Sequence, residues 1–201
     1  YFVNGNFTLF RDAMLGSLGK ELGLDTQGYR LAVAYINGKY WGIYNIREKL
    51  NEHYLESHFG VPNNRVDLIE GYGSANSGSV ATYSRMRSLV NRTNTEEDYR
   101  EVEETYLDIA NFIDYYLSVI FFQNFDIGNI KCWRSREEGD DGRFRWLLYD
   151  QDYGFNLWPE GVYQPAMKQN FSDYENMFTF YTNTRGSGWP NGSDRTLLLA
   201  K

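Results

Sequence analysis

Three carboxylates and one amide near the middle of the chain have residue types that could bind a metal ion and orient a hydroxyl group. They are Asp126, Asn129, Asp150 and Asp152. Carboxylate and amide oxygens are ligands that Mg²⁺ prefers, and a phosphoryl-transfer site needs carboxylates both to hold metal and to orient the acceptor. Asp, Asn and Gly are also the ordinary residues of turns, so these residue types alone are equally consistent with two acidic turns.

A predicted hairpin explains how these groups could meet. Residues 130–134 and 143–149 have the composition of two antiparallel strands, and the polar, glycine-containing segment 137–142 is the expected turn between them. Because a hairpin brings its open ends together, we expect Asp126 and Asn129, which enter it, to lie close to Asp150 and Asp152, which leave it.

The remaining elements are predicted from periodicity and from helix-capping and turn residues. The clearest hairpin comprises residues 30–36 and 40–46 around the turn Asn37-Gly38. Another strand is expected over 66–70, followed by a flexible glycine-rich loop over 71–78. Helices are expected over 8–22, 49–59, 80–90, from Thr95 with a capping-box pattern, and over 109–123; no structure is assigned beyond 156.

Composition excludes several classes of protein. Hydrophobic residues make up 42% of the 201, including 17 Tyr and 13 Phe, which indicates a folded protein. The net charge of −7 argues against a general nucleic-acid binder, but metal and a few local cations would still permit ATP binding. The single cysteine, Cys132, excludes an internal disulfide and is expected to be a buried hydrophobic residue. No apolar run has the length of a membrane span.

Several motifs, in this order, resemble the CotH family of spore-coat and cell-surface kinase-like proteins. The family's segment before its first hairpin resembles Leu9-Phe-Arg-Asp-Ala13, and its hairpin block resembles Tyr35-Ile-Asn-Gly-Lys-Tyr-Trp-Gly-Ile-Tyr44 followed by Glu48, Tyr54 and Leu55. The family's catalytic segment resembles Asn124-Phe-Asp126 with Asn129, together with residues 146–152. The shared order of these motifs is far more specific than any one of them.

The resemblance implies an α+β protein with a reduced, atypical two-lobed protein-kinase-like fold. One domain would cover residues 1–201 and continue beyond both ends, with an N-lobe-like part over 1–75 and a helical C-lobe-like part over 76–201 that carries the catalytic segment 124–154. The implied activity is transfer of the ATP γ-phosphoryl group to Ser or Thr of protein partners with Mg²⁺ or Mn²⁺. The implied location is extracellular, on a cell surface or in a spore coat.

The resemblance also implies a role for each candidate site residue. Asp126 matches the catalytic-loop aspartate that orients the acceptor hydroxyl, and Asn129 matches the asparagine that binds a second metal ion. The interval between these two residues is shorter than the family often shows. Asp150 and Asp152 match the pair that holds Mg²⁺, and Asp152-Tyr-Gly154 is similar to the Asp-Phe-Gly of ordinary kinases.

The cation that would contact the ATP phosphates is expected near the end of the first hairpin. The candidates are Arg47, Glu48 and Lys49, in which Glu48 would pair with a cation as in the Lys–Glu arrangement of kinases. The alternative is a charged strand end that runs into a solvated helix. Gly71 and Gly73 form only a pair, so they are weak evidence for a phosphate-binding loop.

Three other functions are consistent with parts of the sequence. An Asp-x-Asp pair also occurs in glycosyltransferases, although the alternating βαβ pattern of a nucleotide-sugar domain is missing. A glycosidase would use two carboxylates without the asparagine. The third alternative is a surface or coat protein that uses the kinase-like fold for adhesion or assembly without catalysis.

Overall fold

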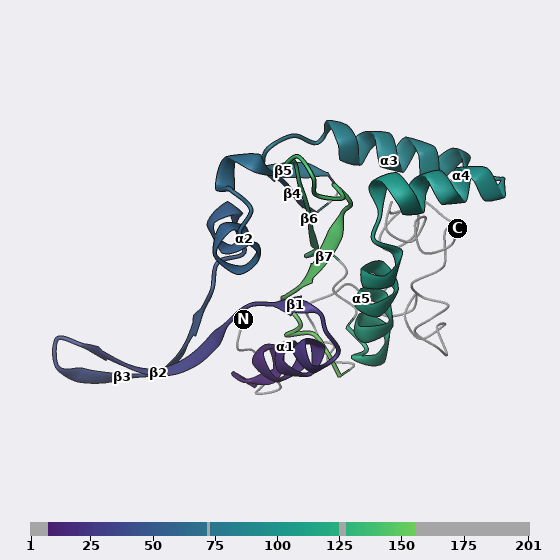
Figure 1. The fold of residues 1–201 in the computed structure, drawn as a ribbon. Coiled ribbons are helices and arrows are strands. Elements are labelled where there is room, and N and C mark those ends of the chain that lie inside the picture. The colour runs from purple at the N-terminus through teal and green to yellow at the C-terminus, as the bar shows by residue number, and fades with distance from the viewer. Residues whose placement is uncertain (1–7, 72, 125–127, 156–201) are drawn as a thin grey trace.

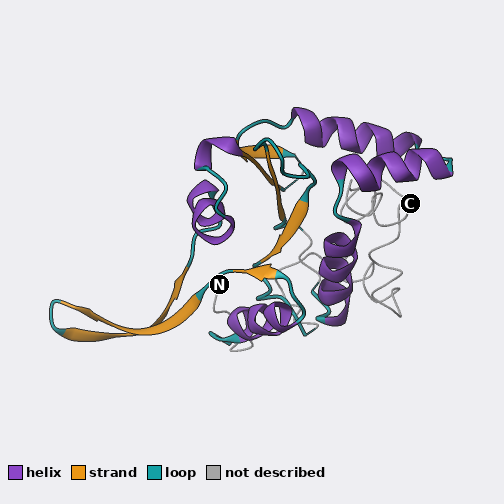
Figure 2. Ribbon diagram, viewed as in Figure 1, coloured by secondary structure: helices purple, strands orange, loops and turns teal. Residues whose placement is uncertain are grey.

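The computed structural model describes residues 8–71, 73–124 and 128–155, which form a mixed five-stranded sheet with helices and a separate two-stranded ribbon (Figure 1). Helices cover both faces of the sheet, and the ribbon extends away from them (Figure 2). The predicted α+β class is confirmed.

The five-stranded sheet has the order β1-β7-β6-β4-β5. Its strands are β1 (Asp25–Thr26), β4 (Val66–Glu70), β5 (Ser74–Ser77), β6 (Lys131–Ser135) and β7 (Arg145–Leu148). Strand β1 pairs with β7 in parallel, and the other neighbours are antiparallel. The predicted hairpin 130–149 is therefore β6–β7 at the centre of a larger sheet, where strands from the first part of the chain flank it on both sides.

The two faces of this sheet belong to two different cores. Alternate side chains of a strand point to opposite faces, and the buried residues divide accordingly. Leu68, Trp133 and Leu147 pack with helix α2 (Glu52–Phe59). The cluster on the other face includes Ile69 and Trp146 of the sheet.

The second face is covered by helices from the middle of the chain. These are α3 (Ala81–Arg92), the π-helical turn η2 (Val102–Tyr106) and α5 (Ile109–Phe121), with the short helix α4 (Glu96–Glu101) between α3 and η2. The helix α1 (Arg11–Glu21) contributes Leu15 to the same cluster, and the 3-10 turn η1 (Asn63–Arg65) precedes β4.

The helices α2, α4 and α5 each begin directly after a residue whose side chain caps the helix. The side chain of Asn51 accepts a hydrogen bond from the Tyr54 amide at the start of α2, and Asp108 accepts one from the Asn111 amide at the start of α5. The predicted capping box of Thr95 with Asp98 is confirmed at the start of α4.

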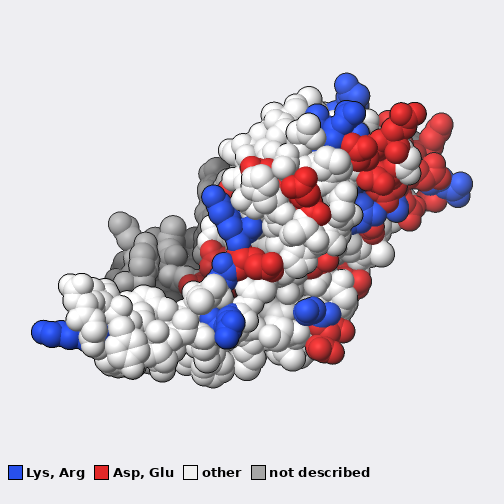
Figure 3. Space-filling model, turned by 60° about the vertical axis from the view of Figure 1, so that its left-hand side comes forward, with Lys and Arg blue, Asp and Glu red and all other residues white. Residues whose placement is uncertain are grey.

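The ribbon comprises β2 (Tyr29–Ile36) and β3 (Lys39–Arg47), as predicted. Asn37 and Gly38 have φ values of 51° and 78°, which a tight hairpin turn requires of both its central residues. No residue within these two strands is buried. Figure 3 shows few charges along the ribbon. Large hydrophobic side chains are exposed there, and they include Leu31, Val33, Tyr35, Tyr40, Trp41, Ile43 and Ile46.

Two strands differ from the sequence predictions. The segment predicted as a flexible loop, 71–78, contains the edge strand β5, which pairs with β4. Ser, Ala and Asn have weak strand preference, and pairing with the neighbouring strand overrides it. Strand β1 is only two residues long, so no periodic pattern could reveal it.

Two expectations from composition can also be compared with the structure. Cys132 is buried in the sheet, and burial raises the pKa of its thiol. Within the described ranges, no helix combines the length and the apolar character that crossing a membrane requires.

Candidate active site

The open end of the β6–β7 hairpin brings together residues that are far apart in the sequence. Lys131 pairs with Leu147 at this end of the ladder, so the residues just outside the two strands meet. The side-chain amide of Asn129 donates a hydrogen bond to a carboxylate oxygen of Asp150 at 2.7 Å. The predicted proximity of the hairpin's entrance and exit is confirmed for this pair.

The chain leaving β7 makes a sharp turn through the predicted metal-binding residues. Asp150 has a φ of 56°, in the left-handed region that few residues other than Gly, Asn and Asp adopt. The amide of Gly154 then donates to the carbonyl of Gln151 at 3.0 Å. A Cβ at position 154 would collide with the buried side chain of Leu15 in α1, so the glycine permits this close approach.

Asn124, three residues after the end of α5, anchors the same turn. Its side chain is 2% exposed and donates to the Gln151 side-chain oxygen at 3.0 Å and to the Asp150 carbonyl at 3.4 Å. Gln151 is equally buried and donates to the carbonyl of Tyr149 at 2.8 Å. The end of α5 and the end of β7 are therefore joined through two buried amides.

Helix α1 binds this turn from another side. The carboxylate of Asp12, which is 8% exposed, accepts a hydrogen bond from the backbone amide of Gln151. The same carboxylate forms an ion pair with Arg47 at the end of β3. The neighbouring Arg11 donates to the backbone carbonyl of Asp152 at 3.0 Å. Helix α1 therefore contacts the peptide groups on both sides of the 151–152 peptide, through the Gln151 amide and the Asp152 carbonyl.

The three residues predicted near the ATP phosphates lie in different surroundings. Arg47 binds Asp12, as described above. Glu48 accepts from the Gly28 amide at 2.7 Å and lies 2.9 Å from a ring nitrogen of His58. The hydrogen bond with His58 is the main reason why the pKa of Glu48 is lowered. Lys49 is exposed and forms no ion pair with any residue that the structure describes.

Glu48 and His58 also line a pocket of about 490 Å³. Helix α1, the segment that contains β1, and α2 enclose this pocket, and Lys20 of α1 provides a cation in its wall. The described side-chain partner of Glu48 is thus a histidine of α2, whereas the expected partner was a cation from a neighbouring strand.

Lys131 is a buried cation near the same end of the hairpin. Its ammonium group donates to the carbonyl of Leu50 at 3.0 Å and lies 3.5 Å from a carboxylate oxygen of Glu70. It also lies 5.5 Å from the ring centroid of Tyr149. Glu70 and Lys131 are direct partners in the β4–β6 ladder. This Lys–Glu pair therefore links β6 to its neighbour β4 at the end of the sheet that lies next to the site.

The described part of the site has donors suited to a hard cation. The predicted catalytic residue Asp126 lies outside the described residues. Within the described residues, no group of three or more His, Cys, Asp or Glu side chains is arranged to hold a metal ion. Asp150, Asp152 and Asn129 offer carboxylate and amide oxygens, the donor set that Mg²⁺ takes.

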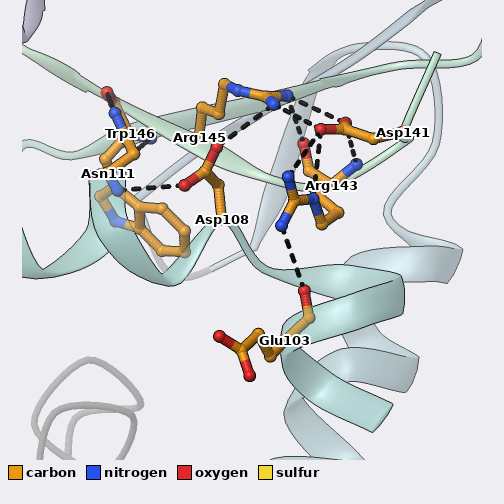
Figure 4. A network of polar contacts seen from close by, with 7 residues as sticks. All are labelled: Glu103, Asp108, Asn111, Asp141, Arg143, Arg145 and Trp146. Carbon is orange, nitrogen blue, oxygen red and sulfur yellow. Dashed lines mark hydrogen bonds and ion pairs between the residues drawn. The ribbon is translucent and has the colours of Figure 1, made fainter. Parts of the chain in front are cut away.

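A second polar cluster occupies the turn end of the hairpin, and it has a different character (Figure 4). The carboxylate of Asp141 accepts hydrogen bonds from the guanidinium groups of Arg143 and Arg145. Arg145 also lies 3.2 Å from Asp108, the capping residue of α5. Hydrogen bonds from Arg145 are the main reason why the pKa of Asp141 lies well below its usual range. These carboxylates are bound by cations of the chain itself.

Sequence reasoning did not predict roles for Asp12, Asn124 and Lys131. Asp12 and Asn124 both lie in motifs that resemble the CotH family, but the resemblance assigned no role to either residue. For Asp12 and Lys131, the available signal was a charged residue in the apolar context of a helix or strand, since such groups are rarely buried without a partner. Their partners come from distant segments, so the sequence alone did not identify them.

The family model described as CotH kinase protein matches residues 5–187 of the chain. A search of curated proteins found no match to the chain.

Proposed function

The chain belongs to the CotH kinase protein family, and on this premise we propose that it transfers the ATP γ-phosphoryl group to Ser or Thr of protein partners. The observation that carries the proposal is the 2.7 Å hydrogen bond between Asn129 and Asp150 at the open end of the hairpin. It places two of the proposed metal-binding side chains side by side, at the junction of α5 with β7. We propose that the cofactors are ATP and Mg²⁺ or Mn²⁺.

Each proposed site residue has a distinct task. Asp126 orients the acceptor hydroxyl and accepts its proton. Asp150 and Asp152 would hold the metal ion, with Asn129 as an additional ligand. The ion would neutralise negative charge on the phosphate oxygens during transfer. Asn129 also keeps the Asp150 carboxylate in place through its amide. The turned backbone at Asp150 sets the direction in which the chain delivers Asp152.

The phosphate-binding residues are proposed at the base of the ribbon. Lys49 is exposed and has no ion pair among the described residues, which suits a side chain that contacts phosphate. Arg47 and Glu48 are the accompanying candidates, and each already contacts another element of the chain.

The fold and location proposed here follow the family. We propose that the ribbon belongs to a reduced nucleotide-binding lobe and that α5 with the β6–β7 hairpin belongs to the second lobe, in one domain over residues 1–201. An extracellular location, on a cell surface or in a spore coat, is proposed on the same ground.

Labelling with γ-³²P-ATP tests the activity. The chain is incubated with Mg²⁺ or Mn²⁺ and a protein acceptor rich in Ser and Thr, in parallel with Asp126→Asn and Asp152→Asn. We expect labelling by the wild type, and a loss of about 10²- to 10⁴-fold with Asp126→Asn because the hydroxyl loses its base. The matched control is Asp140→Asn, an exposed aspartate at the other end of the same hairpin, which should label like the wild type.

Two results would contradict the proposal. The first is the absence of both labelling and thermal stabilisation by ATP with metal in the wild type. The second is equal labelling by the wild type and by both aspartate variants, which would assign the activity to a contaminant. Stabilisation by a nucleotide sugar but not by ATP would favour a glycosyltransferase.

The ribbon favours one alternative function. Its large side chains, such as Tyr35 at 64% exposed and Trp41 at 61%, form an apolar surface of the kind that often serves protein interaction. A non-catalytic surface or coat protein would use such a surface for adhesion or assembly. The labelling experiment separates the two functions, because an assembly protein would label nothing with any metal.

A further inference from the structure

We propose that Asp12 is a positioning residue, which fixes the backbone of residues 150–152 and thereby sets the affinity of this turn for its metal ion. Its ion-pair partner Arg47 holds the Asp12 carboxylate in place. The inference rests on the proposed function, because that function assigns metal binding to Asp150 and Asp152. It assigns to Arg47 a task that differs from phosphate contact.

The contacts of Asp12 are specific for one segment of backbone. One oxygen of its carboxylate accepts the Gln151 amide hydrogen, and the other pairs with the Arg47 guanidinium. Gln151 lies between the two proposed metal-binding aspartates. Its amide is buried in this contact, and a buried amide without a partner would destabilise the turn.

Arg11 strengthens the specificity of this contact. Its guanidinium donates to the carbonyl of Asp152 at 3.0 Å, so α1 presents an acceptor and a donor from consecutive residues. The turn presents the complementary donor and acceptor, also from consecutive residues. A shift of the turn by one residue along the helix would break both contacts, and this fixes its register against α1.

Charge is the reason why an aspartate suits this position. A buried carboxylate needs a paired cation, and Arg47 provides one. An ionised carboxylate is also a stronger hydrogen-bond acceptor than a neutral group, which tightens the contact with Gln151. Groups that orient metal ligands from outside the coordination sphere commonly change metal affinity 10- to 100-fold, and Asp12 has the geometry of such a group.

Asp67 provides a matched control for the loss of a buried carboxylate. It is 1% exposed, accepts the Ser79 backbone amide at 2.9 Å and pairs with Arg134 at 2.8 Å. It thus makes the same kinds of contact as Asp12. Its partner Arg134 lies at the end of β6 that leads into the turn, away from Asp150 and Asp152.

The experiment measures the turn and the metal separately. Amide hydrogen exchange of residues 149–155 reports on the backbone, and electron paramagnetic resonance of free Mn²⁺, titrated with a non-hydrolysable ATP analogue present, reports on affinity. Both are measured for wild type, Asp12→Ala, Asp12→Asn and Asp67→Asn. Circular dichroism first confirms that each variant is folded, and Asp12→Asn serves if Asp12→Ala is not.

We expect Asp12→Ala to accelerate exchange over 149–155 and to lower Mn²⁺ affinity about 10- to 100-fold. Asp12→Asn retains an acceptor for the Gln151 amide, so exchange should stay closer to the wild type and the loss of affinity should be smaller. Asp67→Asn should leave the Mn²⁺ affinity unchanged, and any faster exchange should be spread over the chain and not concentrated in 149–155.

The outcomes distinguish this inference from the proposed function. Unchanged exchange over 149–155 in Asp12→Ala overturns the positioning role, and so does faster exchange with unchanged Mn²⁺ affinity. An equal effect of Asp67→Asn on Mn²⁺ affinity would also overturn it, since any lost buried carboxylate would then suffice. A wild type that binds no Mn²⁺ with nucleotide overturns the proposed function, while the exchange data still decide whether Asp12 holds the turn.

Discussion

The two ends of the β6–β7 hairpin use the same residue types for different purposes. At the turn end, the carboxylates of Asp67 and Asp141 are each bound by two guanidinium groups of the chain. At the open end, Asp150 accepts a hydrogen bond from the amide of Asn129. Asp12 pairs there with the guanidinium group of Arg47 and also accepts a hydrogen bond from the backbone amide of Gln151.

We propose that this difference separates stability from metal binding within one hairpin. At the turn end, guanidinium groups neutralise the carboxylates. These ion pairs link β4 to β6 and link β7 to the start of α5. At the open end the polar groups of α1 and α5 hold the backbone of the turn, and the site aspartates are delivered by that backbone. We therefore expect substitutions at the turn end to change stability and those at the open end to change metal binding.

The largest change in stability is expected from Asp67→Asn. The variant leaves Arg134 and Arg136 beside a neutral amide, and breaking a buried ion pair costs about 3–5 kcal/mol. Both arginines keep some contact with water, so we expect a value near the lower bound, about 3 kcal/mol. Urea unfolding at pH 7 measures it. A loss of Mn²⁺ affinity without a loss of stability would reverse the assignment of the two ends.

The two asparagines of α5 and its end provide a matched pair for a second prediction. The backbone amide of Trp146 donates to the side-chain oxygen of Asn111 at 2.6 Å, and the side-chain amide of Asn111 donates to the Trp146 carbonyl. Asn124 donates to Gln151 and to the backbone of Asp150. Substitution of either by Ala should lower the free energy of unfolding by about 1–3 kcal/mol, because polar partners in the interior lose their bonds.

Only Asn124→Ala should also weaken Mn²⁺ binding, because only Asn124 contacts the turn that carries the site aspartates. Thermal unfolding and the Mn²⁺ titration of both variants decide the matter. If Asn111→Ala weakens Mn²⁺ binding as much, the hairpin transmits disturbance along its length, and its two ends are not independent.

Local signals in the sequence predicted most elements of the fold. The turn Asn37-Gly38 defines the ribbon, and the capping box at Thr95 marks the start of α4, because both depend on interactions within a few residues. The two-residue strand β1 and the edge strand β5 depend on distant partners, β7 and β4. Their own residues carry no comparable pattern, so the five-stranded sheet could not be predicted.

The candidate site was predictable to the same extent. The meeting of Asn129 with Asp150 follows from hairpin geometry, which is local. The contact of Asp12 with Gln151 joins residues 139 positions apart, and that of Lys131 with Leu50 joins residues 81 apart. No spacing rule connects such residues, so the groups that hold the site became known only from the structure.

The smallest effect is expected from Asp141→Asn, and it depends on pH. Hydrogen bonds from Arg145 lower the pKa of Asp141 in the folded protein. The ionised Asp141 therefore stabilises the fold above the pKa that an Asp side chain has in the unfolded chain, about 3.9. The contribution is lost as the pH falls through that value toward the folded pKa. Asp141 is partly exposed, and we expect a loss of about 1 kcal/mol or less in the variant at pH 7.

Urea unfolding of wild type and Asp141→Asn from pH 7 down to pH 3 measures this dependence. The difference in the free energy of unfolding should shrink below about pH 4, as the Asp141 carboxyl group of the wild type becomes protonated in the unfolded state but stays ionised in the folded state. Asp140→Asn, at the exposed neighbouring position, removes the same charge without removing a guanidinium contact and should change stability less. A difference that grows toward low pH would show that Asp141 is not held in its ionised form, and the turn end would then lose its distinction from the open end.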